Sequence, residues 1–374
     1  MENTALTYLC PDCGAYLRFD GKADQWVCDY CDGKFDREQL EQRGADIKDD
    51  DYEVKPYEEA EKDTSTVEYQ YNENIQQSDD GMENMRGFVC PSCGAEIVTD
   101  AVTAATFCVF CGNPTVLPAQ LTGKHRPAAV IPFETDKEDA KKAFLNLCKG
   151  KKLLPKGYTS EQRLEKITGV YVPFWLFDCR ADFDYHATGE DVRTWSDSRY
   201  IYTKTDSYHI HRAGRMDFEN IPLDASEKMR DDLMDALEPF HIDKKRPFDM
   251  SYLSGFLAEK YSYEPKDLYD RMTQRITPGV ENMAGQGRAY DRVYGVRCHT
   301  DFSSDKQTYM LLPVWMLMSK YKDKEYLFAM NGQTGKIVGE LPVSGSQAWK
   351  WFFIIFFICF IISGAVAVFL GGGF

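Results

Sequence analysis

The apolar and polar positions divide the chain into regions of different character. From Val130 to about Leu341, short apolar runs alternate with segments whose apolar residues recur at helical spacing. This alternation predicts a globular α+β body, which we place at residues 125–343. By contrast, residues Trp351–Leu370 are apolar throughout, with one serine and no charge.

Three helices are predicted within the body. Residues 136–149 carry apolar side chains on one face at helical spacing. The segment Asp224-Ala-Ser-Glu227 has the spacing of a capping box and predicts the start of a second helix. Pro265 suits the first turn of a third helix, because its missing N–H is not needed there.

Strands are predicted at 171–177, 181–186, 200–202, 310–317 and 326–330. Asn331-Gly332 and the run that follows predict a hairpin, because these residues tolerate the positive dihedral angles of a tight turn. The runs that contain Trp175 and Trp315 share a Pro-x-Trp core, which favours an internal duplication of the body. Chance recurrence of a Pro-Trp strand start is the alternative, and both indoles are interpreted as core side chains.

Acidic residues are concentrated before the body. The net charge is −15, and residues 46–86 hold fourteen Asp and Glu against four Lys and Arg. Such a segment cannot bury enough apolar surface to order itself, so residues 45–86 are predicted to form a flexible linker. A chain this acidic, without a separate basic patch, repels phosphate backbones, and nucleic acid is therefore an unlikely partner.

Two cysteine modules, at residues 1–44 and 87–118, flank this linker. Each has two Cys-x-x-Cys pairs separated by fourteen residues, and the second module repeats the first at an offset of 80: Cys10, Cys13, Cys28 and Cys31, then Cys90, Cys93, Cys108 and Cys111. Two such pairs supply the four thiolates of a tetrahedral zinc site. Redox pairs or an iron site are the alternatives, but a thioredoxin-like pair would need a βαβ setting that is missing here. We predict two β zinc ribbons, each with one structural zinc ion.

Four thiolates close the coordination shell, so these predicted sites are structural rather than catalytic. The first ribbon has three basic residues against six acidic ones between Tyr8 and Asp36. A ribbon that binds nucleic acid needs cations against phosphate, so contact with a protein is favoured. Tyr30 and Phe110 are candidate contact residues, with packing on their own ribbon as the alternative.

The apolar stretch 351–370 is long enough to cross a bilayer as one transmembrane helix. Trp349, Lys350 and Trp351 stand at its start, where indoles and a lysine suit the membrane interface. No signal peptide is recognisable at the start of the chain, and reduced zinc thiolates require a reducing compartment. The expected arrangement is a tail-anchored, single-pass protein of the cell membrane whose N-terminal bulk is cytoplasmic.

No catalytic motif is recognisable, and the chain is predicted not to be an enzyme. His209 and His211 would share one face of a strand, but no acidic or cysteine partner is identifiable nearby. Asp182 and Asp184 likewise fit a solvated edge better than an acid–base pair. Cys148, Cys179 and Cys298 carry no motif and are interpreted as core residues.

The chain resembles the TFIIB-type zinc-ribbon-containing membrane proteins of Gram-positive bacteria. The resemblance rests on the paired Cys-Pro-x-Cys-Gly-Ala ribbons and on segments 131–133, 169–175, 238–240 and 252–256. It implies a bacterial protein that recruits or holds phage-shock-protein-A-like or SPFH-type proteins in a membrane-stress system. The replication and helicase labels given to some relatives do not transfer, because every helicase motif is missing here. The first ribbon ends Cys31-Asp-Gly rather than Cys-Gly, which leaves the metal site intact.

These observations predict a membrane-anchored adaptor whose first ribbon, carried on the linker, searches for a protein partner. The alternative is a replication- or transcription-linked protein whose ribbons bind nucleic acid near the membrane. A third class, an enzyme that acts through the α+β body, would need a polar pocket.

Overall fold

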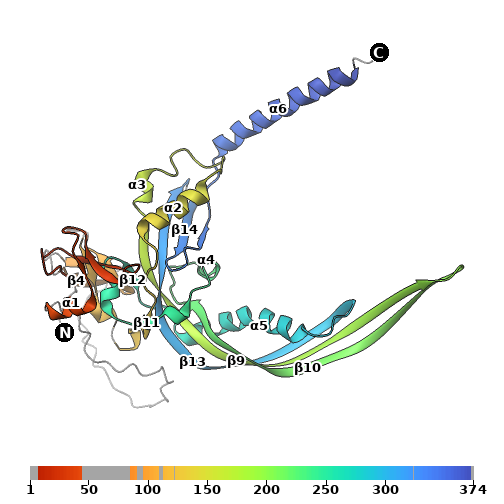
Figure 1. Ribbon diagram of the computed structural model, residues 1–374, viewed down its shortest axis with the longest axis horizontal. Coiled ribbons are helices and arrows are strands. Elements are labelled where there is room, and N and C mark those ends of the chain that lie inside the picture. The colour runs from red at the N-terminus through yellow and green to blue at the C-terminus, as the bar shows by residue number, and fades with distance from the viewer. Residues whose placement is uncertain are drawn as a thin grey trace, which may run out of the picture.

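The computed structural model describes residues 7–43, 85–90, 96–108, 113–121, 123–322 and 324–371 (Figure 1). The predicted linker at 45–86 lies almost entirely outside the described residues, and its flexibility stays a prediction. The described part has a small N-terminal cysteine module, a β-rich body and one long C-terminal helix.

The first cysteine module is a three-stranded antiparallel sheet followed by a short helix. Its elements are β1 (Leu17–Asp20), β2 (Gln25–Cys28), β3 (Lys34–Phe35) and α1 (Arg37–Gln42). Asp36 caps α1 in a capping box with Gln39.

The second module contributes two hairpins. Strands β4 (Met85–Val89) and β5 (Glu96–Asp100) pair with each other, and β6 (Thr103–Phe107) pairs with β7 (Pro114–Val116). β6 also pairs with β12 (Leu257–Glu259) of the body. This part of the predicted second ribbon therefore forms one edge of the body sheet.

The body is built on a ten-stranded mixed sheet with the path β11-β8-β13-β9-β12-β6-β7. The remaining strands are β8 (Ala129–Val130), β9 (Thr168–Ser196), β10 (Ile201–Asp224), β11 (Arg246–Pro247), β13 (Arg292–Tyr321), β14 (Lys324–Asn331) and β15 (Ile337–Gly339). β10 pairs with β9, and β14 pairs with both β13 and β15. The β14–β15 hairpin is confirmed, but its connection is the loop 332–336 with positive φ at Gly335, and not a tight turn with positive φ at Asn331-Gly332.

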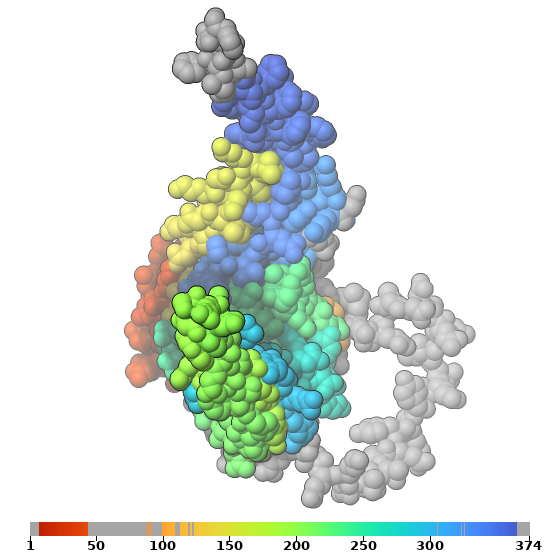
Figure 2. Space-filling view, turned by 90° about the vertical axis from the view of Figure 1, so that its right-hand side faces the viewer, coloured from red at the N-terminus to blue at the C-terminus, as the bar shows by residue number. Residues whose placement is uncertain are grey.

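Three strands continue far beyond the body and form a curved arm (Figure 1). β9, β10 and β13 are 29, 24 and 30 residues long, so the short strands predicted at 171–177 and 181–186 are one continuous strand. Residues 169–177 of β9 are buried on both faces in the body, and alternation begins where the arm leaves it. Figure 2 looks toward the arm, whose green strands stand in front of the body.

Helices cover parts of the sheet. They are α2 (Lys137–Cys148), α3 (Glu161–Leu164), α4 (Asp231–Ala236) and α5 (Tyr269–Gly285), and α5 lies along the concave face of the arm (Figure 1). The helix predicted at 136–149 is confirmed as α2, which Asp136 caps, and Pro265 opens a 3₁₀ turn that leads into α5.

The predicted helix start at Asp224 is wrong. Asp224 ends β10 with its side chain buried and paired with Arg271 at 2.8 Å, so it does not cap a helix. α4 begins at Asp231 instead, after Arg230, which makes no side-chain cap.

The two Pro-x-Trp runs lie side by side in antiparallel strands, and Val172 of β9 pairs directly with Leu312 of β13. Each of the two long strands also pairs, on its other side, with a short parallel strand. β12 runs parallel to β9 and β8 runs parallel to β13.

Each tryptophan of these runs makes an equivalent hydrogen bond. The Trp175 indole donates to the carbonyl of Tyr263, and the Trp315 indole donates to the Thr135 hydroxyl, each at 3.0 Å. Both acceptor residues stand just before a helix cap. Thr135 precedes Asp136, which caps α2, and Tyr263 precedes Glu264, which caps the 3₁₀ turn before α5. The two runs thus share the same kind of strand pairing and indole contact, whereas an internal duplication of the body stays a prediction; both indoles are buried as predicted.

The last helix, α6 (Gly345–Gly371), projects from the body (Figure 1). Its part at Gly345–Gly364 has a mean hydropathy of 1.7, and none of its residues is buried in the protein. It is long and apolar enough to cross a membrane.

The first cysteine module packs against the body rather than standing apart from it. Phe19 meets Tyr252 edge to face at 4.8 Å between ring centres, and the Trp26 indole donates to the carbonyl of Ser251. Gly21 lies so close to Phe133 that a Cβ would fall 1.7 Å from its carbonyl oxygen. This docking differs from our expectation of a ribbon that searches freely, because its aromatic side chains share one core with the body.

Candidate metal centre

Two turns bring the first four predicted ligands together: Cys10, Cys13, Cys28 and Cys31. In each turn the first cysteine's N–H donates to a carbonyl five residues on, from Cys10 to Ala15 and from Cys28 to Gly33. The backbone reverses through positive φ at Gly14 and Asp32. β1 and β2 pair Leu17 with Cys28, which places the two turns at the same end of the hairpin.

The distances between these sulfurs fit a tetrahedral ion. Sγ of Cys10 lies 3.7 Å from Sγ of Cys31, and Sγ of Cys13 lies 3.5 Å from Sγ of Cys28. A tetrahedron with zinc–sulfur bonds of about 2.3 Å has sulfurs about 3.8 Å apart. All four Sγ atoms lie within 4.8 Å of one another, so this group can hold a zinc ion.

The charge balance of the thiols also favours a cation. Burial opposes ionisation of Cys28, but the backbone N–H groups of Cys31 and Tyr30 and the Cys13 side chain lower its pKa to about 7. The backbone N–H of Gly33 lowers the pKa of Cys31, yet the Cys13 thiol and burial outweigh it and raise that pKa to about 12. Cys31 therefore stays protonated at neutral pH by itself, and a divalent ion would favour its thiolate form.

The second predicted site is described only in part. Cys90 and Cys108 are buried and contact each other. The N–H of Cys108 donates to the carbonyl of Asn113, which repeats the five-residue pattern of the first site. Cys93 and Cys111 lie outside the described residues, so a second four-cysteine zinc site stays a prediction.

The predicted membrane-interface residues lie in the first turns of α6. Trp349 is exposed, and the ammonium of Lys152 lies 4.2 Å from the ring centre of Trp351. Lys350, between them, is exposed as well. The arrangement suits a helix that enters a bilayer just beyond the body.

A second group of potential ligands lies on the arm, where the sequence indicated only exposed strand residues. Asp184 Oδ1 lies 3.1 Å from Nε2 of His186 and 2.7 Å from Nε2 of His211. Our statement that His211 lacks an acidic partner is therefore wrong, because pairing of β9 with β10 brings Asp184 to it. The cross-strand register supplies this partner, and the local pattern around His211 gives no sign of it.

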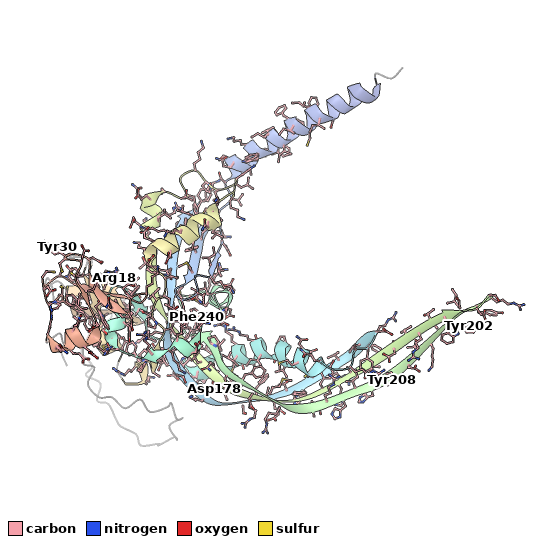
Figure 3. All side chains as sticks on the ribbon, viewed as in Figure 1. Arg18, Tyr30, Asp178, Tyr202, Tyr208 and Phe240 are labelled. Carbon is pink, nitrogen blue, oxygen red and sulfur yellow. The ribbon has the colours of Figure 1, made fainter. Side chains whose placement is uncertain are left out.

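Tyr30, the candidate contact residue of the first module, is 83% exposed and points away from the body (Figure 3). Phe110 lies outside the described residues. Cys148 and Cys179 are buried as predicted, whereas Cys298 is only partly buried.

Comparison with known proteins gives one informative match. No family model matches the chain, and no solved structure matches it. The chain is 38% identical over 260 residues to a protein of Bacillus subtilis (strain 168) described as "Uncharacterized protein YdjG", a match that covers 69% of this chain and 76% of that protein. At this identity and coverage, the chain belongs to the same protein family as YdjG of Bacillus subtilis.

Proposed function

We propose that this protein is a membrane-anchored adaptor that holds a protein partner at the cytoplasmic face of the cell membrane. α6 is the anchor, Trp349, Lys350 and Trp351 sit at the interface, and the N-terminal bulk stays in the cytoplasm. Two structural zinc ions hold the cysteine modules. The resemblance to TFIIB-type zinc-ribbon membrane proteins suggests phage-shock-protein-A-like or SPFH-type partners.

The observation that carries this proposal is the exposed surface of the arm. Its tip displays the large side chains of Trp195, Tyr200 and Ile201, which are 53%, 64% and 77% exposed. Contiguous exposed apolar side chains are typical of protein-contact surfaces. A long, thin arm of three strands exposes a large surface to a partner although it buries few residues of its own. An adaptor needs such a surface.

The first module adds a second candidate contact surface at the far side of the molecule. Figure 3 shows Tyr30 and Tyr202 at opposite ends of the part outside α6. Because the module is docked, Tyr30 is held in a fixed position relative to the arm. We propose that the partner contacts one of these two surfaces.

The charge of the first module supports a protein partner over nucleic acid. Four of its five described basic side chains are already in ion pairs with acids: Arg18 with Asp29, Lys22 with Asp136, Arg37 with Asp249 and Arg43 with Asp12. Only Lys34 has no ion pair among the described residues. Few cations therefore remain for phosphate contacts.

Affinity purification of the full-length protein from detergent-solubilised membranes tests the proposal. Changing the ribbon cysteines would also disturb the docked body, so surface changes are the sharper probes. We would compare Tyr30→Ala with the tip variant Trp195→Ala/Tyr200→Ala, and use Tyr263→Ala, an exposed tyrosine elsewhere on the body, as the control.

Loss of a co-purifying protein in one of the two surface variants, with retention in the control, would support an adaptor and locate its contact. The absence of any stoichiometric protein partner for the wild-type chain would refute it.

A further inference from the structure

The face of the arm that points away from α5 gathers histidines and aspartates. Four of the six histidines of the chain lie in the arm strands β9, β10 and β13: His186, His209, His211 and His299. The opposite face carries Tyr185, Ala187 and Ile210, which pack with Ala284 of α5. Strand alternation therefore separates an apolar inner face from an outer face of potential metal ligands.

Three donor atoms converge within this outer face. His186 and His211 are direct cross-strand partners, and Asp184 lies two residues along β9. The two imidazole rings are stacked at 4.3 Å with an angle of 9° between their planes, and both Nε2 atoms approach the same oxygen of Asp184. The three donor atoms lie within 4.8 Å of one another.

We propose that Asp184, His186 and His211 form a binding site for a divalent transition-metal ion of the zinc type. Two imidazoles and one carboxylate are a donor set that zinc uses where it keeps an open position. Zinc lies about 2.0–2.2 Å from nitrogen and oxygen ligands, so the two rings, which are now nearly parallel, must turn about their side-chain torsions before both Nε2 atoms face one ion. The paired strands hold the backbone of the three ligands in register, so only side-chain torsions need to change.

The site would differ from the cysteine centre in both access and ligand chemistry. The three side chains are 51%, 42% and 50% exposed, so a bound ion would face solvent. His209 lies on the same face, with its ring centre 5.5 Å from that of His186, but it is not among the three residues whose donor atoms lie within 4.8 Å of one another. The ion would join β9 to β10 midway along the arm.

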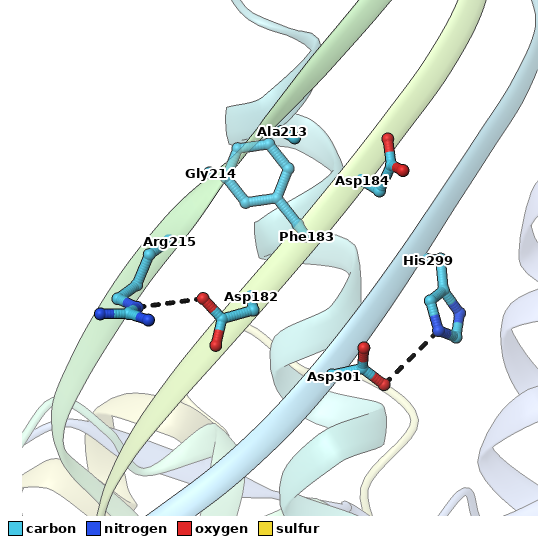
Figure 4. Close-up of a pocket in the computed structure, with 8 residues that line it drawn as sticks. All are labelled: Asp182, Phe183, Asp184, Ala213, Gly214, Arg215, His299 and Asp301. Atoms are coloured by element: carbon cyan, nitrogen blue, oxygen red, sulfur yellow. Dashed lines mark hydrogen bonds and ion pairs between the residues drawn. The ribbon is translucent and has the colours of Figure 1, made fainter.

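A shallow hollow of about 530 Å³ adjoins the site. Figure 4 shows Asp182, Asp184, His299 and Asp301 on this face, with α5 behind the strands. Asp182 and Asp301 are engaged with Arg215 and His299, whereas Asp184 faces the imidazoles of His186 and His211. An open position on the ion would therefore border a recess in which an exogenous carboxylate or imidazole could bind it.

Cobalt binding to the full-length protein in detergent, prepared without a polyhistidine tag, tests this inference. The cysteine centre is first saturated with zinc, and Co²⁺ is then titrated while the visible spectrum is recorded. A histidine–carboxylate site gives d–d bands without the thiolate-to-cobalt charge-transfer band that a cysteine site would add. This spectrum reports the arm site separately from the cysteines and from any partner binding.

The matched variants are His186→Gln/His211→Gln, Asp184→Asn and, as the control, His299→Gln on the same face. We expect the double variant to lose the d–d bands and Asp184→Asn to weaken cobalt binding by at least about tenfold, since even outer-shell losses cost that much. His299→Gln should titrate like the wild type.

These side chains are exposed or, for His186, half exposed, so far-UV circular dichroism should show unchanged folding. The proposal is overturned if the wild type gives no d–d bands at cobalt in large excess over protein, or if the double variant titrates like the wild type.

Discussion

Asp224 is a buried carboxylate whose replacement by asparagine should stabilise the protein at neutral pH. Its side chain is fully buried at the end of β10, and burial raises its pKa to about 6 although Arg271 lowers it. The folded protein therefore holds a proton on Asp224 more tightly than the unfolded chain, whose pKa is near 3.8. At pH 7 the folded state bears the cost of a buried negative charge.

The size of this cost follows from the pKa. At 1.36 kcal/mol per pKa unit, a rise from 3.8 to about 6 corresponds to about 3 kcal/mol at neutral pH. This contribution destabilises the folded state fully above pH 6, and it is relieved as the pH falls from 6 toward 4, because the folded state takes up the proton first. Asp224→Asn imitates the protonated form and should remove this pH dependence. Arg271 keeps Asp235 at 2.7 Å and Asp231 at 3.2 Å as partners.

The measurement is the thermal midpoint of wild type and Asp224→Asn in detergent at pH 7 and pH 4. At about 2–4 °C per kcal/mol for a domain of this size, the variant should melt up to about 6–12 °C higher at pH 7. At pH 4 the two should differ little. Using the difference between variant and wild type cancels the titration of all other groups. A variant that melts lower at pH 7, or by an equal amount at both pH values, would show that the Arg271 pair outweighs burial.

Asn331 occupies a position comparable to that of Asp224, so the opposite substitution, asparagine to aspartate, can be tested there. β14 pairs Asn331 with Val314, and β10 pairs Asp224 with Phe174. Its amide donates to the carbonyls of Leu237 and Pro239 at 3.1 and 3.2 Å. Asn331→Asp removes both donors and turns a carboxylate toward two carbonyls. We expect a loss of about 2–4 kcal/mol at pH 7, seen as a lower thermal midpoint.

Three further changes test the docking of the first module and the equivalence of the two Pro-x-Trp runs. Gly21→Ala should displace the module, because the new Cβ meets the Phe133 carbonyl, and limited proteolysis should then cleave there faster. Zinc removal by a chelator, or Cys28→Ser, should unfold the module and shift Trp26 fluorescence to longer wavelength, since zinc peptides of this kind gain about 10–16 kcal/mol from the metal. Trp315→Phe should lower the free energy of unfolding by about 1–2 kcal/mol, seen in a thermal melt, because the hydrogen bond from its indole to the Thr135 hydroxyl is lost.

Each of these three changes has a matched control. Lys22→Ala, which removes an exposed ion pair at the same contact, should change stability by less than about 1 kcal/mol. Cys298→Ser should leave the emission of the module unchanged. Trp175→Phe should cost about as much as Trp315→Phe, and a large difference between them would contradict the equivalence of the two positions.

The sequence predicts best where local chemistry decides the structure. The two Cys-x-x-Cys pairs meet as expected because each turn is specified within six residues. The helix predicted at 136–149 is found as α2 for a similar reason, since its apolar spacing lies within one segment. The long apolar helix is predicted from the segment Trp351–Leu370, because the composition of this segment alone distinguishes it from the body.

The sequence predicts least where distant segments decide. Asp224 resembles a helix cap locally, but Arg271, in a helix that starts far along the chain, draws it into the core. The strands of the arm are broken by polar residues, and pairing with β10 and β13 is what joins them. The Asp184 cluster depends on the register of two strands, which no single segment determines.

The docking of the first module changes what loss of a zinc ion from its four cysteines would do. A ribbon on a free linker would lose only its own fold when the metal leaves. Here Phe19 and Trp26 belong to the same core as Tyr252 of the body, so unfolding the module would expose that part of the core to water. Metal occupancy, the integrity of the body and the position of Tyr30 would thereby be coupled through apolar contacts rather than through a flexible tether.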